Sequence, residues 1–221
     1  MSWLKRLGLG GDEPPPRSLE HPRDLQPGDI IQFDFTAQPQ LRNQGFTVRE
    51  IWTLDTGGDE SKRIYFQLEG VEHNFRLRVV NDREIEVAME LLPDELLQLF
   101  DEEAIVELLD VESGTQHLLQ TLAPPDELGD TFSGWCAALY RQEGYVTAYR
   151  YHHDYRHQQI PDEMGRGEVG CDLAWLVSDD RQHLLEFRIF DGGRTEVHLA
   201  VILPLRKIAE LWPAGKKGES G

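Results

Sequence analysis

Residues 75–91, FRLRVVNDREIEVAMEL, decide the fold, because a similar pattern returns 112 residues later as FRIFDGGRTEVHLAVIL at 187–203. Between 75–100 and 187–212 there are 6 identities in 26 positions without a gap, and Arg76 falls on Arg188 and Ala88 on Ala200. Each segment alternates apolar and polar residues around a short turn, which predicts an antiparallel hairpin. We interpret the repeat as a tandem duplication. The alternative is that any strand, turn, strand and short helix gives this spacing.

The same alternation continues outward from each hairpin. Runs rich in β-branched and aromatic residues predict strands at 29–35, 46–54, 63–69, 74–80 and 84–91, and again at 133–141, 145–153, 172–178, 184–190 and 196–203. A short strand is expected at 116–122, between the two sets. The fold class is therefore mainly β (α+β).

A short helix is expected to close each set of strands. Pro93, Asp94 and Glu95 suit the first turn of a helix, and its apolar stripe allows an interruption near Asp101. Residues 206–212 predict the second helix, which Pro213 ends. The architecture is two tandem antiparallel β-meander units, each closed by a short helix.

Composition and the glycine- and proline-rich segments divide the chain into four parts. Residues 1–26 contain a Gly-Gly and a Pro-Pro-Pro run and are expected to form a disordered or extended tail. The first unit spans 27–122, the second unit spans 126–213, and 214–221 is a flexible tail. No apolar run approaches the ~20 residues of a membrane span. Residues 1–7 do not begin a signal peptide, so we expect a cytoplasmic protein with Cys136 and Cys171 as free thiols.

The formal net charge of −18 restricts the partners of the protein. Such a chain repels phosphate backbones, which disfavours nucleic acid. A basic protein surface or a polyamine is the better match. The alternative is that acidic surfaces only keep a protein soluble.

Acidic side chains are most concentrated in the helical region 94–112, which contains no lysine or arginine. Its eight acids are Asp94, Glu95, Asp101, Glu102, Glu103, Glu107, Asp110 and Glu112. The corresponding helix of the second unit carries Arg206, Lys207 and only Glu210. Our hypothesis is that the first region docks a basic protein segment; a merely solvated helix is the alternative.

A second polar cluster is YRYHHDYRH at 149–157. His152, His153, Asp154 and Arg156 are the residues of an alternative polar or enzymatic site there. Their spacing is poor for a metal and lacks an HExxH or CxxC pattern, so no metal is expected. We favour a structural Asp154–Arg156 pair that locks this segment against the sheet.

Other signatures of catalysis or cofactor binding are not apparent. Ser133–Cys136 lacks the order of a nucleophile elbow, and the glycine-rich runs 8–11 and 165–170 follow no strand–helix unit. No cofactor is therefore expected. Trp3, Leu4 and Leu7 form a small amphipathic patch suited to weak membrane or partner contact, although a disordered start is the simpler interpretation.

Five segments carry a family resemblance. They are Leu25–Ile31, Gly134–Trp135, Tyr149–Arg156, and Gly193–Val197 together with Leu211–Pro213. In these segments the chain resembles an uncharacterised bacterial family, the YjfK-like proteins, and similar patterns occur in a wider group of domains of unknown function. The resemblance transfers no catalytic residue. It implies companions such as phage-shock-type membrane-remodelling proteins, small membrane proteins and glutathionylspermidine-synthetase-like enzymes.

These observations favour a non-enzymatic cytoplasmic accessory or scaffold protein that binds a basic protein partner, in an envelope-stress context that the resemblance implies. One alternative is a binder of a small ligand such as a polyamine. The other is an enzyme with its site around His152–Arg156.

Overall fold

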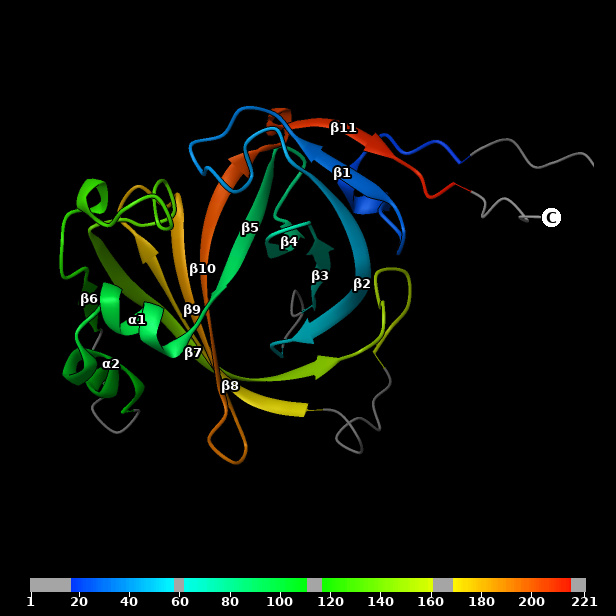
Figure 1. The fold of residues 1–221 in the computed structure, drawn as a ribbon. Helices are drawn as coiled ribbons and strands as arrows, with labels where there is room; N and C mark the ends of the chain where they lie inside the picture. Colours follow the sequence, from blue (N-terminus) through cyan, green and yellow to red (C-terminus); the bar gives the residue numbers. More distant parts are fainter. Residues whose placement is uncertain (1–16, 58–61, 111–116, 161–168, 216–221) are drawn as a thin grey trace, which may run out of the picture.

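The chain folds into one large antiparallel sheet with two short helices (Figure 1). A computed structural model describes residues 17–57, 62–110, 117–160 and 169–215. The strands are β1 (Ile30–Phe33), β2 (Gly45–Asp55), β3 (Lys62–Glu69), β4 (Asn74–Val79), β5 (Glu84–Leu91), β6 (Leu118–Gln120), β7 (Leu139–Tyr151), β8 (Val169–Ser178), β9 (His183–Phe190), β10 (Thr195–Pro204) and β11 (Ile208–Trp212). The helices are α1 (Pro93–Leu99) and α2 (Glu102–Leu109).

Eight of these strands close into a barrel. The sheet order is β11-β1-β2-β3-β4-β5-β10-β9-β8-β7-β6, and β2 also pairs with β7. The closing pairs are Thr53–Tyr151, Leu54–Arg150 and Asp55–Tyr149. The barrel thus consists of two consecutive runs, β2–β5 and β7–β10, that meet at β5–β10 and at β2–β7.

The junction of β5 and β10 brings together residues that the repeat relates. Ala88 lies directly opposite Ala200 in the antiparallel register. The two halves are therefore parts of one continuous sheet. The turn between β9 and β10 contains Gly192 and Gly193 with φ of 90° and 85°, a conformation that glycine adopts without steric cost.

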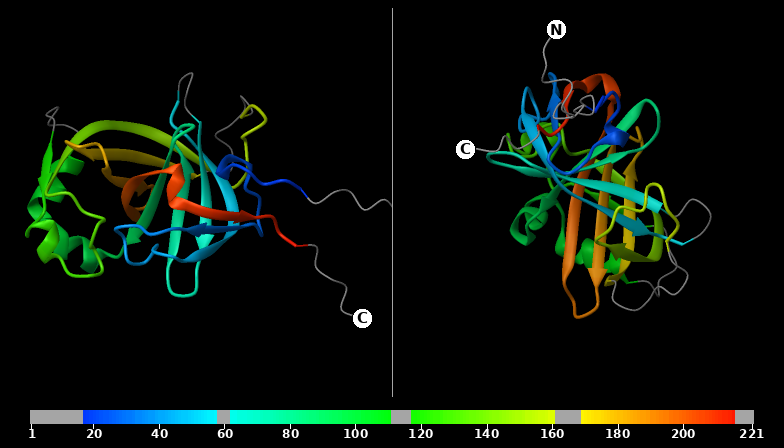
Figure 2. Two further views of the ribbon diagram at one scale, coloured as in Figure 1. Left: turned by 90° about the horizontal axis from the view of Figure 1, so that it is seen from above. Right: turned by 90° about the vertical axis from the view of Figure 1, so that its right-hand side faces the viewer.

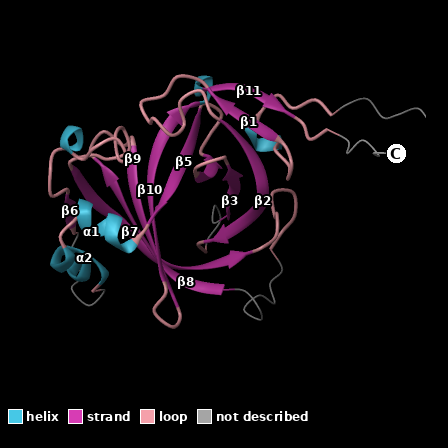
Figure 3. Cartoon of the chain, viewed as in Figure 1, coloured by secondary structure: helices cyan, strands magenta, loops and turns pink. Residues whose placement is uncertain are grey.

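The main hydrophobic core lies on the outer face of the barrel. Phe66, Leu77, Val87, Phe187 and Leu199 point to this side and are buried. They are covered by α1, α2, β1 and the loop 125–138, whose Trp135 stacks on Phe75 at a centroid distance of 5.4 Å. Figure 3 shows α1 and α2 together on one side of the barrel. This covering layer explains why the strands are apolar on a face turned away from the barrel interior.

The predicted helix 206–212 is wrong. Residues Leu205–Lys207 form one 3₁₀ turn, and Ile208–Trp212 form β11, which pairs with β1 through Ile31–Leu211 and its neighbours. The edge of β1 offers backbone hydrogen bonds, and Ile208 and Leu211 pack on the outer core, so strand pairing prevails over helical periodicity. Figure 2 shows β1 and β11 side by side at one end of the barrel.

The predicted strands 133–141 and 145–153 are one strand, β7, which begins only at Leu139. Gly144 suggests a break, but it lies inside β7 beside a register shift between Gln142 and Gly144. A Cβ atom at Gly144 would come within 2.1 Å of the Trp175 ring. The glycine is needed for this close approach, not for a turn.

Two further expectations concern the first helix and the N-terminal segment. The interruption of the first helix is confirmed, because α1 ends at Leu99 and Asp101 caps α2 by accepting a hydrogen bond from Ala104 N. Residues 17–26, assigned to a tail, instead pack on the sheet. Pro22 and Leu25 are buried, and Arg17 pairs with the buried Asp29, so this segment has enough apolar contact to be held.

Candidate functional site

The acidic residues predicted as a docking surface lie on α1, α2 and their ends, at the side of the molecule opposite β2 (Figure 1). Glu95 accepts a hydrogen bond from Leu92 N at 2.8 Å, so part of the charge serves helix capping. Asp94, Glu102, Glu103, Glu107 and Asp110 are exposed. Leu97 and Val106 are also exposed, at 44% and 64%, so the surface combines charge with apolar area. Glu112 lies outside the described residues.

The His152–Arg156 segment follows β7, and its two charged residues, Asp154 and Arg156, pair with each other. Arg156 pairs with Asp154 (Nη2–Oδ2 2.6 Å) and donates to Arg23 O and Leu25 O at 2.5 and 2.9 Å. Its guanidinium also lies over the Phe66 ring. His152 and His153 are exposed. Within the described ranges, no group of three or more His, Cys, Asp or Glu side chains is placed to hold a metal.

A buried charge cluster inside the barrel is the most unusual feature of the structure. Glu186 on β9 accepts a hydrogen bond from Arg76 on β4 at 2.8 Å, although β5 and β10 separate these strands in the sheet. The same carboxylate lies 2.7 Å from Arg188 Nη2 and 3.7 Å from Arg63 Nη1. The Glu186 carboxylate on the inner face thus forms ion pairs with three guanidinium groups.

A second carboxylate, Glu86 on β5, completes this cluster. It lies 3.5 Å from Arg76 Nη2 and accepts two hydrogen bonds from Arg78, at 3.1 and 2.5 Å. The connected cluster therefore contains four arginines, namely Arg63, Arg76, Arg78 and Arg188, and two glutamates. Two positive charges remain unmatched within it.

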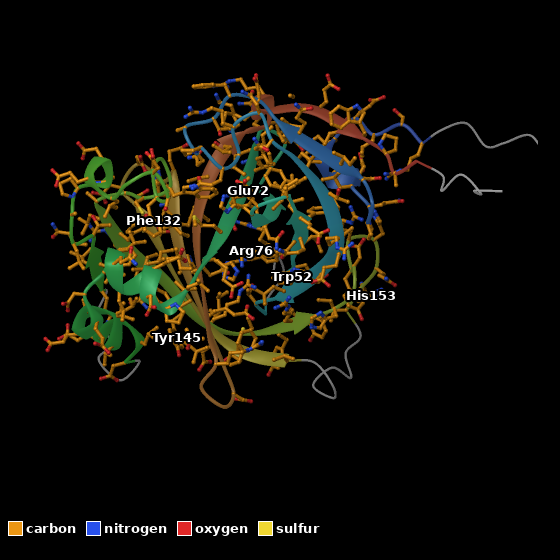
Figure 4. The ribbon with its side chains drawn as sticks, viewed as in Figure 1. Trp52, Glu72, Arg76, Phe132, Tyr145 and His153 are labelled. Carbon is orange, nitrogen blue, oxygen red and sulfur yellow. The ribbon has the colours of Figure 1, made fainter. Side chains whose placement is uncertain are left out.

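Aromatic rings alternate with these guanidinium groups. Trp52 and Tyr65 are stacked at a centroid distance of 4.4 Å. Arg188 lies over both rings, at 4.7 and 5.1 Å, and Arg76 lies over Tyr65 at 4.4 Å. Figure 4 shows Trp52 and Arg76 within the ring of strands, whereas His153 lies at its periphery. Cation–π attraction offsets part of the cost of burying these charges.

Several buried polar atoms on the inner face have no hydrogen-bond partner within the described part of the chain. They are Trp52 Nε1, Tyr65 Oη, Arg76 Nε, Arg150 Nε, His198 Nδ1 and all three side-chain nitrogens of Arg188. Arg188 Nη2 is close to Glu186, but its orientation lies outside hydrogen-bond geometry. Arg188 is 1% exposed, so bulk water does not satisfy it.

The charges shift the pKa values of their neighbours. Burial opposes ionisation of Glu186, but Arg188 and Arg76 outweigh it and hold the pKa of this carboxyl far below its usual range. Burial, together with Arg76 and Arg188, lowers the pKa of His198 well below its ordinary value. Farther along the inner face, burial and the charge of Glu196 raise the pKa of Glu90. His198 is therefore neutral in the folded protein.

A surface pocket of about 640 Å³ lies where β3 and β4 separate. The pairing of these strands ends at Phe66–Leu77, and the pocket is lined by the diverging residues beyond it. Its lining contains five cations and one carboxylate: Arg23, Lys62, Arg63, Arg78, Arg156 and Asp24, beside His157. Arg63 and Arg78 belong both to this pocket and to the buried cluster, so the two features are continuous.

Most pocket cations also contact a carboxylate, but Lys62 has no such contact among the described residues. Arg23 pairs with Asp82, and Arg156 pairs with Asp154. Lys62 Nζ instead contacts the backbone oxygens of Tyr155 and Gln158 at 3.4 and 3.2 Å. When the partners Asp82 and Asp154 are counted, the described residues of pocket and cluster comprise seven cations and five carboxylates, a local positive excess in a chain of net charge −18.

The cysteines do not supply a reactive thiol to this region. Both are free and buried. Burial raises the pKa of Cys136 to about 12 and that of Cys171 to about 11. The thiolate form, which is the nucleophile, is therefore disfavoured at neutral pH.

The barrel cluster was not predicted from the sequence, although one signal for it was present. The repeat places Arg76 on Arg188, and both prove to be buried on the inner face. Alternating polar residues on a strand ordinarily indicate a solvated face. Only closure of the sheet turns that face into an interior.

No protein family model, curated protein or solved structure matches this chain. Among the described helices, none has the length and apolar character needed to cross a membrane.

Proposed function

We propose that this is a non-enzymatic cytoplasmic binding protein whose ligand is a small anionic molecule, held in the pocket between β3 and β4. The observation that carries the proposal is the concentration of five cations around a 640 Å³ pocket in a strongly acidic chain. The net charge of the chain opposes the approach of anions, so a pocket lined mainly by cations is a favourable place for an anion to bind. A pocket of this size is within the range used for small ligands.

Lys62 is the cation best suited to contact such a ligand. Its ammonium contacts the backbone oxygens of Tyr155 and Gln158, and among the residues that the structure describes no carboxylate contacts it directly. Arg156 is less suited to that role, since it ties Asp154 to the segment around Leu25. The ligand would therefore bind at a preformed rim of positive charge. Among the described cations of this rim, Lys62 is the one without a direct carboxylate contact.

The same features oppose the two alternatives drawn from the sequence. A polyamine would meet like charge in the pocket, and its binding would have to occur on the acidic exterior. An enzyme at His152–Arg156 would lack an activated nucleophile, and Arg156 is already engaged by Asp154. We therefore favour binding of an anion over either alternative.

The experiment compares two lysines that both donate to backbone carbonyls. Lys62→Gln removes the pocket charge, whereas Lys207→Gln removes a lysine that contacts Phe35 O away from the pocket. Thermal unfolding is followed with phosphate, succinate, citrate and spermidine, since a ligand that binds only the native state raises its stability. We expect stabilisation by at least one anion, weakened by Lys62→Gln and retained by Lys207→Gln. Stabilisation by spermidine alone would contradict the proposal.

A basic protein partner remains a second proposal, favoured by the exposed Leu97 and Val106 among the acids of α1 and α2. An amphipathic basic segment would match both kinds of side chain. The tandem duplication is also a proposal. It is supported by the two four-strand runs and by the Ala88–Ala200 pairing at their junction.

A further inference from the structure

In the buried cluster inside the barrel, the described arginines outnumber the carboxylates that contact them. Within the described ranges, the ion-pair partners of Arg63, Arg76, Arg78 and Arg188 are Glu86 and Glu186, and Arg188 lies 2.7 Å from Glu186 without forming a hydrogen bond. A buried charge is costly unless an opposite charge and hydrogen bonds compensate for its loss of hydration. Stacking on Trp52 and Tyr65 reduces this cost but does not satisfy the guanidinium N–H groups.

The unsatisfied atoms near Arg188 share a chemical character. Trp52 Nε1 is a donor only, the Tyr65 hydroxyl is able to donate, and the guanidinium offers donors alone. Trp52 and Tyr65 stack on each other and the Arg188 guanidinium lies over both rings, so the three unsatisfied side chains are neighbours on the inner face. A group that accepts several hydrogen bonds and carries negative charge satisfies all three.

We propose that the barrel interior binds an oxyanion, a phosphate or carboxylate group, with Arg188 as its principal cation and with the Tyr65 hydroxyl and Trp52 indole as neutral donors. Guanidinium groups match the oxygens of both anion types through paired hydrogen bonds. The proposal rests on the proposed function for its route of entry, because Arg63 and Arg78 line the outer pocket and also contact the carboxylates of the cluster. The ligand's anionic group would pass the pocket and end at Arg188.

Tyr65→Phe is the sharpest variant for testing this site. The hydroxyl has no partner in the described chain, so its removal should not lower the thermal midpoint of the ligand-free protein. Binding of inorganic phosphate or succinate, measured by isothermal titration calorimetry at constant ionic strength, should weaken by about tenfold or more, the effect of losing a hydrogen bond to a charged group. Arg188→Gln should abolish binding, and Arg188→Lys should restore only part of it.

A spectroscopic measurement locates the anion directly. In a ¹H–¹⁵N spectrum, phosphate should shift the indole signal that disappears in Trp52→Phe. Phosphate and succinate serve as separate arms, so the spectrum and the calorimetry show which oxyanion the interior accepts.

The outcomes separate this inference from the proposed function. If Lys62→Gln weakens anion binding while Tyr65→Phe and Arg188→Lys leave it unchanged, the anion stops in the outer pocket and the interior site is wrong. If no anion binds the wild-type protein, both proposals are wrong. Loss of affinity in Tyr65→Phe, with an unchanged ligand-free midpoint and a shifted Trp52 signal, supports the interior site.

Discussion

Arg76 and Glu186 form an ion pair across the barrel, with Nη1 and Oε1 2.8 Å apart and 110 positions between them in the chain. The exposed fractions of the two residues are 3% and 5%, so the pair is shielded from solvent on both sides. Because β4 and β9 do not neighbour each other in the sheet, this contact depends on closure of the barrel. It links the two halves of the chain through charge, not through the outer apolar core.

Replacement of Glu186 by glutamine should strongly destabilise the fold. The change leaves Arg76 and Arg188 buried without their shared carboxylate, a situation that costs about 3–5 kcal/mol in free energy of unfolding. Urea denaturation followed by tryptophan fluorescence measures the loss. Glu143→Gln is the control, since Glu143 pairs with Arg181 at the surface and its loss should change stability little. Equal effects in the two variants would mean that the barrel pair is not buried in solution.

His198 should make stability depend on pH in the mildly acidic range. Its neighbours on the inner face are Arg76, Arg188, Glu186, Arg150 and, as its register partner, Glu90. The pKa of the folded state is lowered, so the unfolded chain binds a proton first as pH falls, and stability decreases below about pH 6.5 by up to ~1.4 kcal/mol per pH unit. That loss ends once pH falls below the pKa of the folded state.

Replacement of His198 by glutamine should flatten this decline. The measurement is the free energy of unfolding of both proteins between pH 7.5 and pH 5. An equal slope in wild type and variant would show that His198 is protonated in the native state. The lowered pKa of Glu186 acts only at lower pH, because its stabilising contribution is complete above the pKa of the unfolded carboxyl and is lost as pH falls below it.

Gly144 should tolerate no side chain. Alanine would place Cβ 2.1 Å from the Trp175 ring, and the required displacement should cost about 1–3 kcal/mol. Gly45→Ala in β2 is the matched control, since nothing lies within 4 Å of a Cβ there. Thermal melts compare the two variants. The double variant Gly144→Ala/Trp175→Leu should recover part of the loss, and failure to do so would exclude the steric explanation.

Reversal of charge on α2 tests the protein-docking proposal. Glu102→Lys/Glu103→Lys/Glu107→Lys should abolish capture of basic partners from lysate at low salt, because exposed charges steer association and are screened over roughly 8 Å at physiological ionic strength. A charge-matched control, Glu20→Lys/Asp191→Lys/Glu210→Lys, changes exposed acids elsewhere. Identical partners and identical salt response for both variants would remove α2 from consideration.

Local pattern was sufficient for most of the strands. The predicted range 84–91 is β5, and 74–80, 184–190 and 196–203 differ from β4, β9 and β10 by one residue at each affected end, because alternation on a two-residue period reflects the pleat directly. The prediction of the second helix was wrong for a tertiary reason, because residues 208–212 pair with β1 as a strand. The strand break predicted at Gly144 was wrong for a similar reason, because the need for glycine there comes from the close approach of Trp175.

The candidate sites also differ in how far the sequence alone predicts them. Charge composition was enough to identify the acidic region 94–112, since a run of like charge depends on residue type and not on position in space. The exclusion of nucleic acid stays a prediction. The basic pocket and the buried arginines required the closed barrel: Arg63, Arg76, Arg78 and Arg188 come from β3, β4 and β9, and only closure brings them to two carboxylates. An alternating strand has two faces, and the chain alone does not state which one water reaches. The β2–β7 pairing closes the sheet and thereby encloses the polar face.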